Sequence, residues 1–209
     1  MRITLKPRKA PRQNRAQETV EAILQATAQL LDEVGYASLS TNHVAQKAGV
    51  SIGSLYQYFP NKEAICAALA ERHYQRHAQR YLQRLREVAA EPVKAQVRAL
   101  VRASFEVARE DPALAKNLYA ELSRIGGFDP LRRMRETIER ELTLIYQALP
   151  RPLRPQHPDM VAFIVTVACG QLLGDVVLRK PQWLKNEAFL DQVCELVLGY
   201  YQRLGWLAT

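Results

Sequence analysis

Residues 51–62, with the sequence SIGSLYQYFPNK, combine side chains that hydrogen-bond well with few that would fill a core. The polar side chains of the helical part of this stretch are Ser51, Ser54, Tyr56, Gln57 and Tyr58. Hydroxyl groups commonly contact phosphate oxygens, and a glutamine carboxamide can pair with the edge of an adenine. Gly53 and Ser54 are small, so base edges can approach the backbone closely. The stretch therefore has the chemistry of a nucleic-acid contact.

Two short helices separated by a glycine must position these groups. We predict that Ser40 caps a helix over residues 41–48. Gly49 is expected to break that helix, and Ser51 to cap a second one that ends at Phe59. The apolar side chains expected to face inward are Val50, Leu55 and Phe59. This is the pattern of a helix-turn-helix, in which the second helix enters the major groove of DNA by its N-terminal end.

The rest of the chain is also helical in its periodicity. The helix that precedes this pair is expected to end at Gly35, and Asn61 is expected to cap a long helix that begins at Lys62. Residues 150–158, PRPLRPQHP, are predicted to be a stiff, extended linker. No stretch alternates long enough to predict a strand. The predicted fold is all-α, with about nine helices in a three-helix head and a larger helical body.

Charge and composition restrict the partners. The chain has 209 residues and a net charge of +8, which favours polyanions. The 17 residues before Glu18 contain six basic residues, including Arg12 and Arg15, and such arms lie along phosphates or in a minor groove. Three widely spaced cysteines without a CxxC pair indicate a reducing cytoplasm. The most apolar stretch, residues 160–174, is shorter than the about 20 residues of a membrane span, so we expect no membrane partner.

Residues 38–65, SLSTNHVAQKAGVSIGSLYQYFPNKEAI, closely resemble the DNA-binding signature of TetR/AcrR-family transcriptional regulators. The resemblance extends over roughly residues 16–76. It implies a homodimeric repressor that binds a palindromic double-stranded operator and is released by a small-molecule effector. We therefore divide the chain into a basic arm over residues 1–15, a DNA-binding domain over 16–76 with its helix-turn-helix at 40–59, and an effector-binding and dimerisation domain over 77–209.

The resemblance also implies roles for individual residues. Thr41, Tyr56 and Lys62 match residues that contact phosphates, and Gln57 matches a variable position that often touches bases. The predicted DNA-contacting set is Ser40, Thr41, Ser51, Ile52, Gly53, Ser54, Tyr56, Gln57, Tyr58, Lys62, Arg12 and Arg15. Ile52 departs from the polar or basic residue that many members carry, so it either contacts a thymine methyl group or makes no contact.

Two apolar helices near the C-terminus provide a candidate dimer interface. Residues 159–180 are apolar nearly all round, so this helix needs cover on more than one side. The interface that we predict consists of Phe163, Val167, Gly170, Gly174, Val177, Val193, Val197 and Tyr201. Its two glycines would permit close helix approach, and a dimer suits a two-fold symmetric operator. The alternative is a buried central helix of a monomer.

The resemblance further implies an effector pocket among the fifth to eighth helices. Candidate lining residues, each of which also fits an ordinary core or surface position, are Ser104, Phe105, Asn117, Tyr119 and Met134. The aliphatic composition favours an apolar or amphipathic effector. By linkage, an effector that binds more tightly when the two heads are wrongly spaced weakens DNA binding by the same factor, with the helix that begins at Lys62 as the mechanical connection.

Two alternative functions remain open. Cys66, His73 and His77 share one face of the long helix, so a metal-responsive regulator is conceivable, although no fourth ligand is evident. A non-specific DNA-binding architectural protein would bind with an affinity set by salt alone. The sequence contains no P-loop, GxGxxG, GxSxG or paired-carboxylate motif, so we predict no enzymatic activity, no cofactor and no metal.

Overall fold

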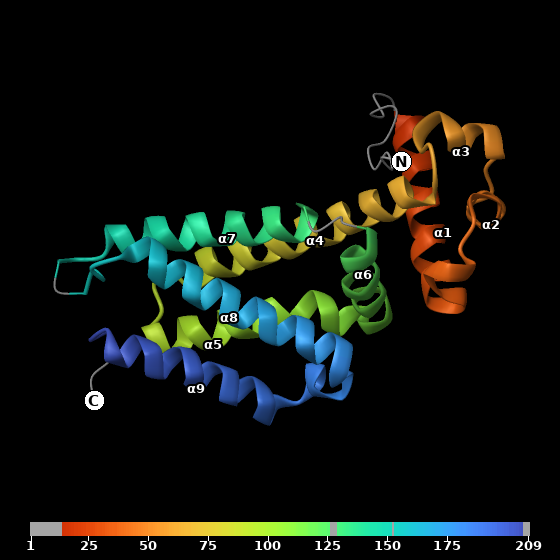
Figure 1. Ribbon diagram of the computed structural model, residues 1–209. Coiled ribbons are helices and arrows are strands. Elements are labelled where there is room, and N and C mark those ends of the chain that lie inside the picture. The colour runs from red at the N-terminus through yellow and green to blue at the C-terminus, as the bar shows by residue number, and fades with distance from the viewer. Residues whose placement is uncertain (1–13, 126–128, 152, 207–209) are drawn as a thin grey trace. The chain divides into compact units, whose positions relative to one another are not determined.

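The computed structural model describes residues 14–125, 129–151 and 153–206, with side chains described for all of these except residues 14, 15, 121–125 and 129. Every regular element in these ranges is helical, which confirms the all-α class (Figure 1). The elements are α1 (Asn14–Ser38), α2 (Thr41–Lys47), α3 (Ile52–Tyr58), α4 (Lys62–Glu87), α5 (Val93–Glu110), α6 (Pro112–Ile125), α7 (Asp129–Ala148), α8 (Pro158–Arg179), the 3-10 helix η1 (Pro181–Lys185) and α9 (Glu187–Arg203).

The chain divides into two compact units, which we describe separately. The head unit comprises residues 1–73 and 113–131, and the body unit comprises residues 74–112 and 132–209. Consequently α4 begins in the head unit and continues in the body unit. Apart from its first residue, α6 belongs to the head unit although α5 precedes it in the chain. The division expected at residue 76 lies within α4 as well.

Serine side chains define the starts of α2 and α3. The Ser40 hydroxyl accepts a hydrogen bond from the His43 backbone N–H at 3.2 Å. The Ser51 hydroxyl accepts one from the Ser54 N–H at 3.0 Å. Each cap satisfies an N–H group that has no partner inside its helix. Both predicted caps are confirmed. Because a cap fixes where a helix begins, the start of α3 is determined by residues close to it in the sequence.

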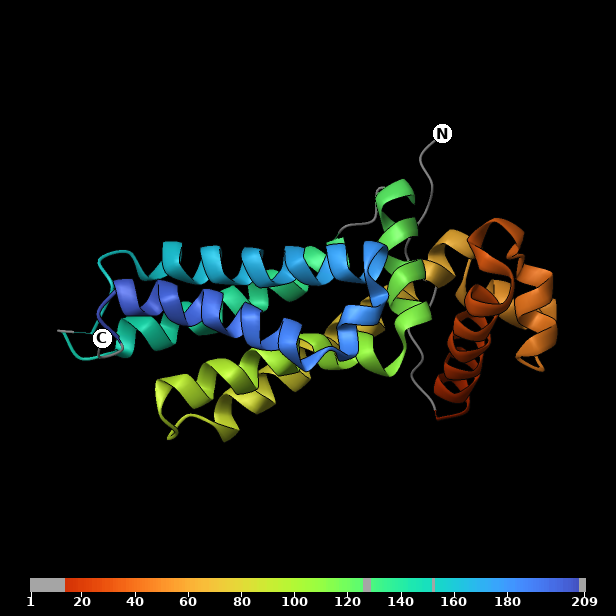
Figure 2. The ribbon, with the colours of Figure 1, turned by 90° about the horizontal axis from the view of Figure 1, so that it is seen from below.

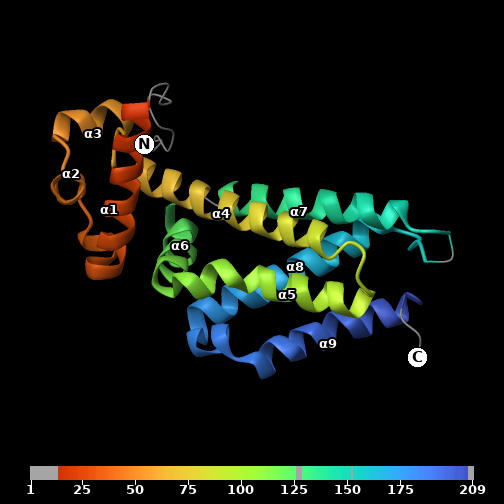
Figure 3. The same ribbon diagram turned by 180° about the vertical axis from the view of Figure 1, so that it is seen from behind.

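The turn between α2 and α3 depends on Gly49. Its φ of +66° lies in the left-handed region that favours glycine. The N–H groups of Gly49 and Val50 bond back to the carbonyls of Gln46 and Ala45, at 3.2 and 3.0 Å. This crossed pair of bonds is the Schellman arrangement that ends many helices. The predicted glycine break is confirmed, and it sends the chain directly into α3 beside α1 and α2 (Figure 3).

Gly35 ends the long first helix as expected. Its φ of 69° and ψ of 171° fall in a region that is essentially restricted to glycine, and they split α1 at this residue.

The core of the head unit lies inward of these turns, where Val44, Leu55 and Phe59 are fully buried. The predicted inward direction of Leu55 and Phe59 is confirmed, whereas Val50 is half-buried.

In the body unit, α5 packs against α8, α9 and η1 (Figures 1 and 2). Phe105 of α5 is fully buried and meets Phe189 of α9 edge to face, with ring centroids 6.0 Å apart. Phe189 in turn stacks on Trp183 of η1 at 5.2 Å. The sequence analysis missed η1. Helix α9 follows it and begins after the Asn186 cap, whose side-chain oxygen accepts a hydrogen bond from the Phe189 N–H.

A buried aromatic cluster joins α7 to the end of α9. The hydroxyls of Tyr146 and Tyr201 are 2.5 Å apart. After α9, Gly205 adopts φ +78° and the chain turns back, so that the Trp206 ring lies 4.6 Å from Tyr201 and 4.9 Å from Tyr146. Burial raises the pKa of Tyr146 to about 12, against the opposing effect of its hydrogen bond to Tyr201. These phenols are therefore neutral at physiological pH.

The structure corrects part of the expected dimer interface. Five of the eight residues predicted there are buried within the chain itself, namely Gly174, Val177, Val193, Val197 and Tyr201. These side chains belong to the core of the body unit and cannot meet a partner. The apolar side chains of α8 and α9 that remain exposed are Met160, Phe163, Ile164, Leu178 and Leu196. For Gly174 and Val177 the error arises because α8 is apolar nearly all round and has no polar face to identify its outer side. The apolar stripe of α9 with Val193, Val197 and Tyr201 instead packs inward within the chain itself.

Two further expectations change in detail. The predicted extended linker contains a turn, because the N–H groups of Leu153 and Arg154 both bond to the carbonyl of Pro150 at 2.9 Å. The apolar stretch at 160–174 belongs to a 22-residue helix, which is long and apolar enough to cross a membrane by length and composition. Half of its most apolar portion is buried inside the body unit, as expected for a core helix.

Candidate nucleic-acid interface

The two sides of α3 differ in burial as a DNA-reading helix requires. Leu55 anchors the inner side and is fully buried. The exposed residues of the N-terminal cap and of the outer side are Ser51, Ile52, Gly53, Tyr56 and Gln57, and Ser54 and Tyr58 are half-buried. A Cβ added at Gly53 would meet only the Ser51 hydroxyl, at 3.9 Å, so the outer surface of the first turn is open. The structure thus brings the predicted base-contacting residues together on one surface.

Two predicted phosphate contacts lie side by side. The Thr41 hydroxyl at the start of α2 and the Tyr56 hydroxyl on α3 are 3.0 Å apart at an exposed position. One hydroxyl donates to the other, which leaves a second donor for an acceptor from outside the protein. The pair can therefore be presented jointly to a phosphate oxygen. This hydrogen bond also links α2 to α3, so the joint contact with a phosphate depends on the angle between the two helices.

Lys62 is engaged within the protein. Its ammonium group donates to the backbone carbonyls of Tyr36 and Leu39, each at 3.2 Å. The same group lies 4.5 Å from the centroid of the Tyr36 ring, a cation–π contact. Two of its three N–H donors are thus directed at the segment between α1 and α2. The sequence analysis assigned Lys62 to a phosphate alone and did not foresee that it ties the start of α4 to this segment.

We expect Lys62→Ala to lower the free energy of unfolding by about 1.5–3 kcal/mol, the usual range for hydrogen bonds made by a charged group. Lys47→Ala is the matched control, because Lys47 forms an exposed ion pair with Glu33 at 2.6 Å and such pairs contribute about 0–1 kcal/mol. Urea unfolding followed by circular dichroism measures both variants. Equal losses for the two would show that the carbonyl contacts of Lys62 do not stabilise the head unit.

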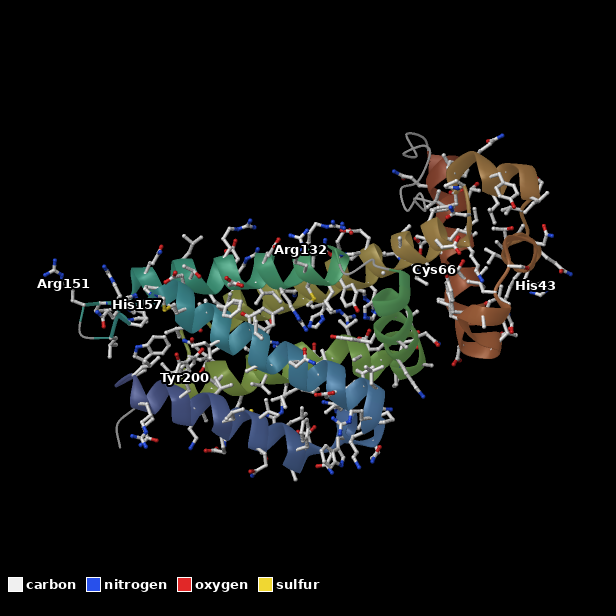
Figure 4. The ribbon with its side chains drawn as sticks, viewed as in Figure 1. His43, Cys66, Arg132, Arg151, His157 and Tyr200 are labelled. Atoms are coloured by element: carbon white, nitrogen blue, oxygen red, sulfur yellow. The ribbon has the colours of Figure 1, made fainter. Side chains whose placement is uncertain are left out.

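The structure adds one candidate DNA contact and leaves two of the predicted ones undescribed. His43, which the sequence analysis did not single out, is exposed on α2 near Thr41, and Figure 4 shows it at the outer side of that helix. The exposure of His43 is known only from the structure, because a helix of seven residues is too short for its apolar periodicity to show which side faces solvent. Arg12 lies outside the described residues. Arg15 lies in α1, and its side chain also lies outside them.

The five residues predicted for an effector pocket have other contacts. Phe105 belongs to the aromatic core of the body unit, and Met134 is also buried there. The Ser104 hydroxyl donates to the Leu100 carbonyl of its own helix at 2.9 Å. In the head unit, the Asn117 amide donates to the Leu31 carbonyl at 3.0 Å, close to the end of the first part of α1. Tyr119 is half-buried in the same unit. These positions are explained by packing, and they do not line one described cavity.

The metal-responsive alternative gains no support from the described residues. Cys66, His73 and His77 are all buried, and within the ranges given above no three His, Cys, Asp or Glu side chains are arranged to hold a metal ion. The cysteines are free thiols, with Cys66 on α4 in Figure 4.

The fold and this interface define a helix-turn-helix DNA-binding protein. Residues 23–69 match the family described as "Bacterial regulatory proteins, tetR family". Residues 92–200, more than half of the chain, match the "Tetracyclin repressor-like, C-terminal domain". The chain therefore belongs to the TetR family of bacterial transcriptional regulators, which confirms the resemblance found in the sequence.

Individual relatives agree with this assignment. An HTH-type transcriptional regulator of Mycobacterium tuberculosis is 41% identical over 58 residues, which is 28% of this chain and 30% of that relative. The matching region thus spans less than a third of the curated relative. A TetR-family regulator from Streptomyces coelicolor has a TM-score of 0.63 at 26% identity, covering 89% of this chain and 99% of the other. FadR from Bacillus subtilis, solved in complex with stearoyl-CoA, shares the fold with a TM-score of 0.62 at 20% identity, covering 85% and 96%.

Proposed function

We propose that this protein is a homodimeric repressor that binds a palindromic DNA operator through α3 and is released by a small-molecule effector. The observation that carries the proposal is the capped, glycine-turned α2–α3 pair, whose exposed side gathers Gly53, Tyr56 and Gln57 over a buried Leu55. This is the geometry with which a second helix reaches base edges in a major groove. The basic arm adds sequence-independent attraction for DNA.

The dimer interface is proposed on a revised set of residues. Met160, Phe163 and Ile164 of α8 and Leu196 of α9 are large apolar side chains exposed on the body unit. Exposed apolar groups that gather on one helix commonly mark an interface, and a two-fold dimer presents two reading helices to a two-fold operator. Sedimentation that gave a monomer at micromolar concentrations and above would contradict this part of the proposal.

The effector is proposed to be an apolar or amphipathic molecule bound by the body unit. Support comes from the largely aliphatic body and from the FadR neighbour, whose ligand is an acyl-CoA. Because α4 runs from the head unit into the body unit, a change in its orientation would alter the spacing of the reading helices. An effector that favours the altered spacing then weakens operator binding by linkage.

Gel shifts with the promoter DNA of its own gene test the proposal. A regulator should prefer a palindromic site over competitor DNA by roughly a thousandfold or more. An architectural protein would bind both with similar affinity and with a steep dependence on salt. Similar affinity for operator and competitor would therefore replace the proposed function with the architectural one, and footprinting on the same fragment would locate the operator.

Two substitutions on α3 should separate positioning from reading. Tyr56→Phe removes the hydroxyl that pairs with Thr41, and we expect about tenfold or greater loss of affinity for every DNA sequence, because a contact to a charged phosphate is lost. Gln57→Ala should instead change the relative preference among operator variants, by about 1–3 kcal/mol at one base pair. Fluorescence anisotropy on a set of single-base operator variants measures both. An unchanged order of preference with Gln57→Ala would assign this residue to the DNA backbone.

A further inference from the structure

The helix-turn-helix motif exposes two large apolar side chains, and both belong to α3. Within residues 40–59, all of which the structure describes, Ile52 is 39% exposed and Tyr56 is 41% exposed. The two are four residues apart, so they are neighbours on one flank of the helix. The Tyr56 hydroxyl is hydrogen-bonded to that of Thr41 at 3.0 Å, whereas Ile52 carries no polar group. The surface expected to meet DNA therefore has an apolar spot that phosphates cannot match.

Ile52 occupies the first position of α3 and follows the Ser51 cap directly. Because a reading helix enters the major groove by its N-terminal end, the side chains of this turn lie nearest to the base edges. The surface next to Ile52 is open, since a Cβ added at Gly53 would meet only the Ser51 hydroxyl, at 3.9 Å. Isoleucine is also stiff about χ1, so it loses less rotamer freedom on binding than a long polar side chain does. Its position and its shape both suit a contact with a base.

The major groove offers an apolar side chain one distinctive partner, the C5 methyl group of thymine. The other groups that distinguish base pairs there are hydrogen-bond donors and acceptors. Isoleucine has neither a donor nor an acceptor, so it cannot replace the water that such a group loses on contact. Against a methyl group it instead removes apolar surface from water on both sides. Thymine is therefore the base that Ile52 can favour over cytosine, the pyrimidine that lacks this methyl group.

We propose that Ile52 contacts the C5 methyl group of one thymine in each operator half-site and thereby selects T·A over C·G at that base pair. This decides between the two roles that the sequence left open for Ile52, a methyl contact and no contact. Two exposed residues of α3 would then read different groups, with Gln57 reading hydrogen-bonding groups and Ile52 reading the presence of a methyl group. The inference rests on the proposed function, because it specifies a base in the operator that the proposed repressor binds.

Replacement of thymine by deoxyuridine tests this contact, because deoxyuridine lacks only the C5 methyl group. Each thymine in one half-site of the footprinted operator is replaced in turn, and binding of the full-length protein is measured by fluorescence anisotropy. One replacement should weaken binding of the unmodified protein roughly 3- to 10-fold, about the effect of one buried methyl group. Ile52→Ala should bind the unmodified operator more weakly, and the same replacement should then change its affinity by less than about twofold, because the two partners are coupled.

Val34→Ala is the matched control. Val34 is another exposed aliphatic residue of the head unit, 44% exposed on α1 and outside the helix-turn-helix, so this variant should keep the full sensitivity to deoxyuridine. If Ile52→Ala folds poorly by circular dichroism, Ile52→Val replaces it in the comparison. Valine lacks one methylene group but keeps the branched Cβ, so it should show an intermediate sensitivity.

Three results would each overturn the inference: half-sites without a thymine, a scan in which no replacement weakens binding, or an equal loss in the unmodified protein and in Ile52→Ala. The proposed function would survive all three, because they presuppose an operator that is preferred over competitor DNA. A protein that bound every duplex alike would contradict the proposed function before any thymine is replaced, and the inference with it.

Discussion

Above pH 10 we expect the free energy of unfolding of this protein to fall steeply, because the body unit buries several acidic groups in their neutral form. Burial raises the pKa of Tyr146 to about 12 and that of Cys169 to about 12, from ordinary values of 10.0 and 9.0. Burial likewise raises the pKa of Tyr81 and Tyr201 well above 10.0. The four groups come from α4, α7, α8 and α9, so their ionisation affects the centre of the body unit.

The sign follows from proton binding. Between the unfolded and folded pKa values the unfolded chain has lost the proton and the folded chain retains it, so rising pH favours unfolding. The stabilisation is fully present below the unfolded pKa and is lost as pH rises through the folded one. A group that is ionised only in the unfolded chain contributes about 1.4 kcal/mol per pH unit. Because an unfolded tyrosine is only half ionised at pH 10, the four groups together lower the free energy of unfolding by on the order of 4 kcal/mol between pH 10 and 11. That loss is a large part of the whole stability of an ordinary domain.

Urea unfolding at pH 8, 9.5, 10.5 and 11.5, followed by circular dichroism, measures this dependence. Tyr146→Phe removes one titrating group, so it should reduce the slope above pH 10 by about 1.4 kcal/mol per pH unit. It should also lower stability at pH 8 by about 1 kcal/mol, through loss of the hydrogen bond to Tyr201. Tyr200→Phe, at a half-buried position, is the control. A slope that Tyr146→Phe leaves unchanged would contradict the role given to this phenol.

Gly53→Ala should reduce operator affinity by about 10- to 100-fold, the effect of overpacking by 1–3 kcal/mol in a close contact, while leaving the free protein as stable as before or slightly more stable. In the free protein a methyl group at this position meets only the Ser51 hydroxyl, at 3.9 Å. Alanine also favours a helix over glycine by roughly 0.5–1 kcal/mol. Any loss of binding therefore reports the space available against DNA and not a damaged head unit.

Gly199→Ala is the matched control for this experiment. Gly199 lies in α9, and a Cβ added there has no neighbour within 4 Å, so the substitution makes the same gain in helix propensity far along the chain from the reading helix. Fluorescence anisotropy with operator DNA and thermal unfolding should be measured for both variants. If Gly53→Ala and Gly199→Ala bound the operator equally well, α3 would not approach base edges as closely as proposed.

Local signals predicted the reading motif well. Ser40, Gly49 and Ser51 each act within a few residues through a cap or a left-handed turn, and all three have the predicted conformation. Leu55 and Phe59 were placed inward correctly because a four-residue spacing determines which side chains share a face of a helix. These features depend on short stretches of sequence, and the family match covers the same stretches.

Residues whose role depends on a distant neighbour were not predictable in the same way. Lys62 bonds to carbonyls at Tyr36 and Leu39, and Asn117 bonds to Leu31, 86 residues earlier in the chain. A long polar side chain on a helix has many partners within reach, and nothing in its own sequence context selects one. The roles expected for these residues, a phosphate contact and an effector contact, were therefore incomplete.

The sequence by itself determined the helical class, the ends of α2 and α3, and the family, because capping, glycine turns and periodicity act locally. Only the tertiary structure decided which apolar residues of α8 remain exposed, since Leu173 and Val177 are as apolar as Ile164 and yet lie in the core. It also placed the guanidinium of Arg135 on α7 against Gly170 of α8. The physical reason is that burial and pairing between helices depend on how several helices pack at once, and a helix that is apolar on all sides has no local pattern from which to read that packing.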